Sequence, residues 1–357
     1  MFDPFPALRP LLHRLDPETA HELTLRALES GLVPAQPRDD DPILATRLFG
    51  REATNPIGLA AGFDKDGRVY EKMHAQGFGF VEIGGITPRA QRGNPRPRVF
   101  RLPEDGAVIN RMGFPNGGAD ALAARLAKKG SGWIPLGINL AANADSADPA
   151  DDFVQLAERF AAYADFLTLD VSCPNTANGQ VFLDPVCLAE MLDRLDAVAW
   201  PARRPKYAAK LAPDIDDALL ERLVGVLLAH RIDALIVSNT TRARDGVHDP
   251  RAAAEAGGLS GRPLFARSTA MLARVREIAG EGVTLIGVGG VASGADAYAK
   301  IRAGASAVQL YTGLVYGGTA LITRIKRELG QLLRRDGFGS VEEARAGGTS
   351  ASRPVLS

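Results

Sequence analysis

A short polar loop at the end of an apolar run carries the residues best suited to chemistry. Residues 168–176 read Thr-Leu-Asp-Val-Ser-Cys-Pro-Asn-Thr, so a strand-like segment passes directly into a turn constrained by Pro174. Cys173 is the candidate base, because a thiol titrates near pH ~8.5 and modest electrostatic help makes it a thiolate at neutral pH. The amide of Asn175 can donate and accept hydrogen bonds. The alternative for Cys173 is a small buried hydrophobe, which is the role we assign to Cys187.

Eight short apolar runs alternate with amphipathic stretches from Asn55 onward. The expected strands are 56–60, 80–83, 136–139, 166–171, 207–211, 234–237, 284–288 and 307–311, and helical spacing fills 153–164, 218–230, 271–279 and 295–303. This alternation predicts parallel strands with right-handed crossovers, and eight such units close into a (β/α)8 TIM barrel, an α/β fold. That architecture places chemistry at the carboxyl ends of its strands.

The residues that follow these runs are unusually polar or rich in glycine. They are Ala61 to Lys65, Asn139, Asp170 to Thr176, Lys210, Ser238 to Thr241, Gly287 to Gly290, and Tyr311 to Gly313. A cation at Lys210 can stabilise the negative charge of a reduced flavin, whereas the usual alternative is a solvated surface lysine. Asparagines at 110, 139, 175 and 239 suit a ring with alternating carbonyl and N–H edges, although a single asparagine is most often a turn residue.

Two of these loops predict a phosphate site. Gly287-Val288-Gly289-Gly290 follows the seventh strand and precedes a helix that begins near Ser293. Glycines there let backbone N–H groups approach an anion, and the helix dipole adds positive potential. Tyr311-Thr312-Gly313 follows the eighth strand, in the second loop that such a barrel site needs. The alternative for the glycines is an ordinary tight turn.

Length and composition favour one large domain with appendages. The 357 residues suit a barrel, and 42 basic residues balance 42 acidic ones, which leaves no net field to attract nucleic acid. Two cysteines and no secretory signal argue against a disulfide framework. We expect residues 1–40 to form helices and 41–335 to form the barrel. Residues 336–357, rich in Gly, Ala, Ser and Arg, are expected to be a poorly ordered tail.

The N-terminal segment predicts two small amphipathic helices. Leu8, Leu11, Leu12 and Leu15 repeat at helical spacing after Phe2 and Phe5, and Asp16-Pro17 resembles an N-cap followed by a first-turn proline. The helices either pack on the barrel or form a hydrophobic mouth for an apolar co-substrate and rest on a membrane surface. No apolar run reaches the roughly 18 residues typical of a bilayer span.

Several long motifs resemble one family. They are Asn55-Pro56-Ile57-Gly58-Leu59-Ala60-Ala61-Gly62-Phe63-Asp64-Lys65-Asp66-Gly67, Gly77-Phe78-Gly79 before Glu82-Ile83-Gly84, Asn110-Arg111-Met112-Gly113-Phe114, and Gly257-Gly258-Leu259-Ser260-Gly261-Arg262-Pro263-Leu264. From the N-terminal helices to about Leu329, the chain resembles the class 2, quinone-dependent dihydroorotate dehydrogenases of pyrimidine synthesis. The resemblance implies oxidation of (S)-dihydroorotate to orotate, with FMN as cofactor and a quinone as acceptor. It also implies a peripheral protein on the cytoplasmic face of the cell membrane.

The resemblance also implies a role for individual residues, with Cys173 as the base. FMN would be held by Ala61, Gly62, Gly85, Asn139, Asp170, Lys210, Ser238, Gly261, Gly290, Tyr311 and Thr312. Dihydroorotate would be held by Lys65, Asn110, Arg111, Met112, Gly113, Phe114, Asp170, Asn175, Asn239 and Thr240. The quinone would enter between the N-terminal helices, with Phe2, Phe5 and the leucines lining its passage and Arg101 and Tyr311 near it.

The chain departs from the family pattern at several of these positions. Cys173 stands where class 2 members usually have serine, and cysteine is the base of the soluble class 1 branch. Asp170 replaces an asparagine, and an ionised carboxylate there cannot donate a hydrogen bond and repels a substrate carboxylate. Gly85 and Ser238 each replace a threonine, and the loop after Thr176 differs. The alternatives are therefore an FMN barrel with another substrate, or a flavin-free phosphate-binding barrel such as an isomerase, an aldolase or a binding protein.

Overall fold

Eight parallel strands close into the predicted barrel. The computed structural model describes residues 5–36, 40–129, 134–172, 175, 178–200, 203–250 and 254–350. The barrel strands are β3 (Ile57–Leu59), β4 (Phe80–Ile86), β7 (Leu136–Leu140), β8 (Phe166–Leu169), β9 (Tyr207–Leu211), β10 (Ala234–Val237), β12 (Thr284–Val288) and β13 (Ala307–Leu310). They are hydrogen-bonded in the order β10-β12-β13-β3-β4-β7-β8-β9, and each overlaps one of the expected strands.

The barrel interior is filled by matching large and small side chains. A Cβ atom on Gly58 would lie 2.2 Å from the ring of Phe80, and one on Gly137 would lie 2.2 Å from the ring of Phe166. Both phenylalanines are fully buried. A hairpin of β1 (Thr46–Leu48) and β2 (Arg51–Ala53) closes the amino end of the barrel, because Phe49 in its turn stacks on Phe166 at 4.0 Å. Large-to-small alternation of this kind keeps a small barrel solid.

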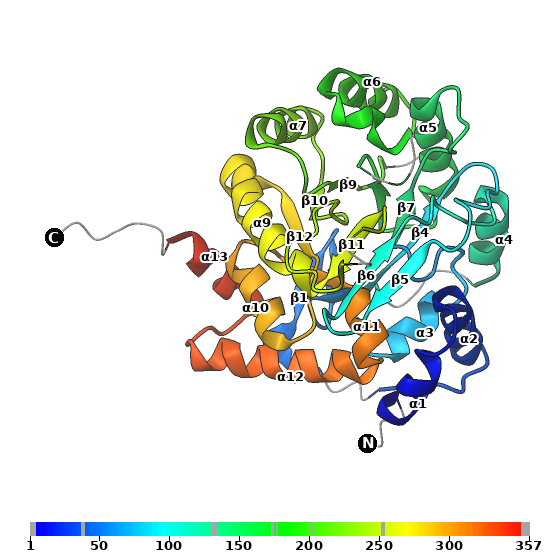
Figure 1. Cartoon of the computed structure of the whole chain (residues 1–357). Helices are drawn as coiled ribbons and strands as arrows, with labels where there is room; N and C mark the ends of the chain where they lie inside the picture. The colour runs from blue at the N-terminus through cyan, green and yellow to red at the C-terminus, as the bar shows by residue number, and fades with distance from the viewer. Residues whose placement is uncertain are drawn as a thin grey trace.

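Helices surround the strands, as Figure 1 shows. They are α3 (Tyr70–Ala75), α4 (Ala119–Lys129), α5 (Pro149–Phe160), α6 (Pro185–Asp196), α7 (Asp217–Ala229), α9 (Phe265–Ala279), α10 (Gly294–Arg302), α11 (Thr312–Gly317) and α12 (Ala320–Arg335). Short 3-10 helices lie at η1 (Pro42–Leu44), η2 (Asn178–Leu183), η3 (Arg262–Leu264) and η4 (Gly280–Gly282). Asp148, Asp184 and Asp216 cap α5, α6 and α7 by accepting a first-turn backbone N–H.

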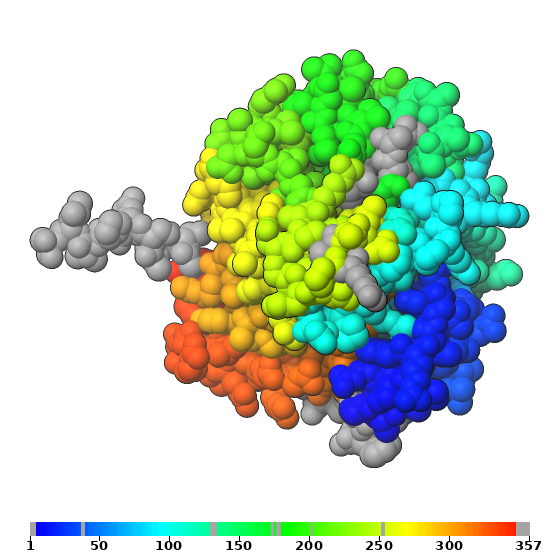
Figure 2. All heavy atoms as spheres, viewed as in Figure 1, coloured from blue at the N-terminus to red at the C-terminus, as the bar shows by residue number. Residues whose placement is uncertain are grey.

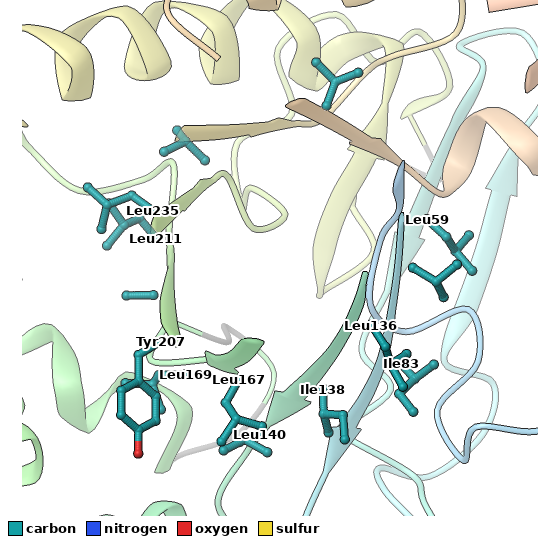
Figure 3. Close-up of a cluster of buried hydrophobic side chains, with 14 of the residues drawn as sticks. Leu59, Ile83, Leu136, Ile138, Leu140, Leu167, Leu169, Tyr207, Leu211 and Leu235 are labelled. Carbon is teal, nitrogen blue, oxygen red and sulfur yellow. The ribbon is translucent and has the colours of Figure 1, made fainter. Parts of the chain in front are cut away.

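The main core lies between the barrel and these helices. Alternate strand residues point outward, and Figure 3 shows Leu59, Ile83 and Leu235 among them, around the outside of the barrel. All three are fully buried against helical side chains. Because both faces of the strands are covered, the strands read in sequence as nearly continuous apolar runs.

A three-stranded antiparallel sheet over the carboxyl ends of the barrel strands was not predicted. It has the order β11-β6-β5, with β5 (Val99–Leu102), β6 (Ala107–Asn110) and β11 (Gly258–Gly261). The Asp105-Gly106 pair between β5 and β6, where Gly106 has φ +57°, is the hairpin signal that could have revealed it. The sheet matters for function because Asn110 and Gly261 reach the barrel mouth from it.

Both predicted N-terminal helices are present. They are α1 (Phe5–Leu12) and α2 (Pro17–Glu29), and Asp16 accepts a hydrogen bond from the Thr19 backbone N–H, as the N-cap prediction requires. Helix α1 contacts α11, and α2 contacts β5. Figure 2 shows this blue segment at the lower right, beside the orange C-terminal and cyan segments. Within the described ranges, no helix has the length and apolar character needed to cross a bilayer.

The expectation of a poorly ordered tail from residue 336 is wrong for residues 341–350. These residues form helix α13 (Val341–Ser350), which packs on α10 with Val341 and Ala344 buried. Arg302 of α10 donates a hydrogen bond to the Ala344 carbonyl at 2.8 Å. The small residues that suggested disorder are what lets this helix approach α10 closely, a tertiary effect that composition does not reveal.

Candidate active site

A cavity of about 870 Å³ opens at the carboxyl ends of the barrel strands. It brings together most of the residues that the sequence singled out, namely Ala61, Gly62, Lys65, Gly85, Arg101, Asn110, Met112, Gly113, Phe114, Asn139, Asp170, Asn175, Lys210, Ser238, Asn239, Thr240, Gly261, Gly290, Tyr311 and Thr312. Segments from residue 61 to residue 312 therefore meet at one place. Volumes of this size suit a cofactor together with small ligands.

Two predicted site residues stand apart from this group. Cys173, the predicted base, lies outside the described residues. Arg111 does not line the cavity. Its guanidinium donates to Glu255 at 2.7 Å and to the Pro97 carbonyl at 3.0 Å, and it lies over the ring of Phe100. An ion pair and a ring therefore hold the Arg111 side chain at the edge of the β11-β6-β5 sheet, and its role in binding substrate stays a prediction.

One end of the cavity is built from glycine backbone. Gly289 and Gly290 follow β12 with φ +103° and +77°, a conformation that side chains rarely adopt. A Cβ atom on Gly290 would lie 2.5 Å from the Cβ of Phe265, at the start of α9, and one on Gly261 would lie 2.3 Å from the Gly106 carbonyl oxygen. The backbone of the Gly289–Gly290 turn therefore lies directly against the start of α9. Such an approach of backbone N–H groups and a helix N-terminus is what an anion site requires.

The middle of the cavity carries a buried polar group that points at a ligand. Asn139 Nδ2 donates to Glu82 Oε1 at 3.0 Å, and Gln309 Nε2 donates to Glu82 Oε2 at 2.6 Å. All three residues are buried, and Asn139 lines the cavity. With its amide nitrogen committed to Glu82, Asn139 is left with an Oδ1 atom that has no partner among the described residues. An orphan buried acceptor requires a donor from elsewhere.

Lys210 and Asp170 are both buried and both line the cavity. Lys210 is the penultimate residue of β9, and Ser172 Oγ donates to its carbonyl at 2.7 Å. Asn239 Nδ2 donates to Asp170 Oδ1 at 3.1 Å. Burial raises the pKa of Asp170, while the Lys210 ammonium acts in the opposite direction. A raised pKa gives a carboxyl group access to a form that donates a hydrogen bond, as the amide of an asparagine does.

The loop after β3 and the loop after β6 face each other across the cavity. Lys65 Nζ donates to the Gly62 carbonyl at 2.6 Å, and burial lowers the pKa of Lys65 to about 8. Phe114, with φ +51°, explains the glycine at position 85, since a Cβ atom on Gly85 would lie 2.6 Å from the Phe114 ring. Asn94, which the sequence did not indicate, donates to the Asn175 carbonyl at 3.0 Å and so ties Asn175 to this wall.

The opposite end of the cavity is apolar and reaches the N-terminal helices. His21 of α2 packs edge-on against Phe63 with ring centroids 5.1 Å apart, and it lies 6.2 Å from Tyr311. Burial lowers the pKa of His21 to about 4, so the ring is neutral at physiological pH. Arg101 donates to the carbonyls of Leu12 and Leu15 and thereby fixes α1 at the rim.

Comparisons with known proteins agree with this geometry. A dihydroorotate dehydrogenase from Cereibacter sphaeroides, named as the quinone type, is 51% identical over 334 residues, which cover 93% of this chain and 94% of that protein. One from Rhodospirillum rubrum with the same name is 48% identical, covering 94% and 92%. A crystal structure of the enzyme from Eimeria tenella in complex with ferulenol superposes with a TM-score of 0.87 at 34% identity, covering 95% and 96%.

A ligand-free structure from the same organism gives a TM-score of 0.88 at 35% identity and covers 95% of this chain and 100% of that one. The sequence profile described as dihydroorotate dehydrogenase matches residues 43–333, which run from within η1 through the whole barrel into α12. The barrel, the β11-β6-β5 sheet and the two N-terminal helices surround one cavity. From the profile match and these relatives, the chain belongs to the dihydroorotate dehydrogenase family.

Proposed function

We propose that this protein oxidises (S)-dihydroorotate to orotate in pyrimidine synthesis, with FMN as its flavin and a quinone as the electron acceptor. The observation that carries the proposal is one cavity, which is lined by asparagines around Asp170 and by apolar side chains around His21. A polar ring substrate and an apolar acceptor then reach opposite ends of one cofactor. The quinone-type relatives at about half identity support the choice of acceptor.

The residues of the cavity fit FMN rather than a flavin without phosphate. At Gly289, Gly290 and Gly261 a side chain would clash with its neighbours. The bare backbone N–H groups can therefore approach a phosphate group closely. The orphan Oδ1 of Asn139 suits the N3–H donor of the flavin ring. Lys210 supplies positive charge for the N1 and O2 edge. Bound there, FMN would supply the acceptor for the hydride from C6 of the substrate and would carry the electrons on to the quinone.

The chain's own groups orient the substrate and move its proton. Lys65, with its lowered pKa, and the amides of Asn110, Asn175 and Asn239 hold the carboxylate and the ring edges of dihydroorotate. Cys173 takes the proton from C5 as the C6 hydride leaves, and the C5–C6 double bond of orotate forms. Asp170 in its neutral form donates to the ligand where the family uses an amide, and its raised pKa is consistent with that form.

We place the quinone passage at the N-terminal helices, and with it a peripheral membrane contact on the cytoplasmic face. Leu8, Leu11, Leu23 and Leu32 are exposed large apolar side chains of this segment. Leu8, Leu23 and Leu32 also line the apolar end of the cavity. A helix pair with such a rim can draw an apolar acceptor from a lipid surface without spanning it.

The direct test is anaerobic mixing of the purified protein with dihydroorotate. The flavin absorbance is expected to bleach and to return when a short-chain ubiquinone is added. Cys173→Ala should slow bleaching by about a hundredfold or more, since general-base catalysis contributes about 10²–10⁴-fold. Cys173→Ser, the residue usual in class 2, is the matched control and should retain part of the rate. A protein that stays yellow rejects the substrate, and an unchanged rate in Cys173→Ala rejects the base.

Asp170 favours one alternative, an FMN barrel whose substrate offers a cationic or amide group in place of a carboxylate. The same preparation separates the two, because orotate perturbs the flavin spectrum only if the cavity accepts its carboxylate beside Asp170. Mass spectrometry of the cofactor released by heat tests the flavin itself. A mass equal to that of FMN is expected, and the absence of any flavin would favour the flavin-free barrel.

A further inference from the structure

Lys300 is a buried amine that the proposed reaction does not use. It lies on α10 with none of its surface exposed, and its stem packs on Gly287, where an added Cβ atom would lie 3.0 Å from Lys300 Cδ. Within the described part of the chain, no carboxylate forms an ion pair with its Nζ atom. Burying an amine without a charged partner is costly, so this position needs an explanation.

The contacts of Lys300 lead to the glycine turn. Its Nζ atom donates to Ser268 Oγ at 2.9 Å and to Thr269 Oγ1 at 3.1 Å, both in the first turns of α9. The Ser268 hydroxyl in turn lies 3.2 Å from the carbonyl oxygen of Gly289 and 3.1 Å from that of Phe265. Lys300 is therefore one hydroxyl group away from the backbone that forms the anion end of the cavity.

The groups around the Lys300 ammonium lie at the start of α9, beside this turn. On the α9 side it meets the two hydroxyls and the ring of Phe265, whose centroid is 5.2 Å away. Phe265 is also the residue whose backbone closes against Gly290. The acidic group that acts on Lys300 through space is Asp296, on the preceding turn of α10.

We propose that Lys300 is the buried counter-charge of the FMN phosphate group, acting from behind the Gly289–Gly290 turn without touching the phosphate itself. The inference rests on the proposed FMN cofactor and adds to it a residue that distinguishes FMN from riboflavin. Burial lowers the pKa of Lys300 to about 7, so a nearby dianion readily holds it in the charged form. In a low-dielectric layer a single charge acts over several ångströms.

A purely structural role predicts a different behaviour. If Lys300 only fills space and satisfies two hydroxyls, its removal disturbs α9 and α10 and weakens every flavin equally. If its charge acts on the phosphate, its removal weakens FMN and leaves riboflavin, which has the same ring and no phosphate, almost unaffected.

The experiment titrates the full chain, freed of its flavin, with FMN and with riboflavin at pH 6.5, where Lys300 is largely charged, and follows the quenching of flavin fluorescence. Lys300→Met is expected to raise the Kd of FMN by about tenfold or more and that of riboflavin by less than about twofold. Lys300→Gln, whose amide keeps a donor for Ser268 and Thr269, should show the same selectivity and replaces the first variant if that one does not fold.

The matched control is Lys326→Met, which removes another buried lysine that is paired with Asp40 and lies away from the cavity. It should leave the ratio of the two Kd values unchanged. An unchanged ratio in the Lys300 variants overturns the role of Lys300 while the FMN assignment stands. If the wild-type chain binds FMN and riboflavin with equal Kd values, the proposed phosphate site itself is rejected.

Discussion

Replacing Gly290 with alanine should damage both stability and flavin binding. At φ +77° a residue with a side chain is strained by about 1–2 kcal/mol. The new Cβ atom would also lie 2.5, 2.7 and 2.9 Å from the Cβ, Cα and N atoms of Phe265. These atoms belong to a helix start and cannot rotate away, and overpacking of this kind adds about 1–3 kcal/mol. The sum is a loss of roughly 2–5 kcal/mol in the free energy of unfolding.

Gly337→Ala isolates the backbone part of this loss. Gly337 has φ +79°, and no atom lies within 4 Å of the position of its Cβ atom, so alanine there should cost only the strain of about 1–2 kcal/mol. Urea denaturation of the flavin-free proteins, followed by circular dichroism, measures both losses, and flavin fluorescence measures the retained cofactor. We expect Gly290→Ala to lose more stability and most of its flavin. Equal losses in the two variants, or a Gly290→Ala protein with full flavin, would refute the clash with Phe265.

Two further perturbations address the N-terminal helices. The pKa of a histidine is ~6.5 in the unfolded chain, whereas that of His21 in the folded chain is about 4. Between these pH values the unfolded chain binds one more proton than the folded chain. The free energy of unfolding therefore falls by up to about 3 kcal/mol as the pH drops from about 6.5 toward 4. His21→Asn should flatten this part of the pH dependence in urea denaturation, and identical slopes contradict the assignment. Leu11→Asp should reduce co-sedimentation with anionic lipid vesicles, whereas Val186→Asp, at an equally exposed side chain on α6 (both 61%), should not. Equal binding by both variants removes the membrane contact from α1.

The barrel was predictable because its signals are local. Each strand is a short apolar run, and polar residues such as Asn139 and Lys210 mark the end at which the runs stop. The parallel connections follow from the intervening helices. The cavity then follows from the fold, since the carboxyl ends of all eight strands meet on one face.

The features that were missed depend on distant partners. Strand β11 contains two glycines in four residues and has no strand propensity of its own; it exists because β6, about 150 residues earlier, pairs with it. The direction of the Arg111 side chain is set by Glu255, which precedes β11 in the chain. Helix α13 depends on α10 for its burial. Lys300 looks in sequence like any lysine on an amphipathic helix, and only the packing of α9 on α10 reveals that it is buried.

The β1-β2 hairpin, with Phe49 stacked on Phe166, closes the barrel at its amino end. Because the described part of the chain closes this end, the substrate and the quinone would both reach the cavity from the carboxyl ends of the strands. An inhibitor built on a carboxylate-bearing ring would then occupy the polar end of the cavity, and a separate apolar inhibitor would occupy the end beside His21. With FMN between the two ends, both compounds would bind at the same time, and each would block one half-reaction.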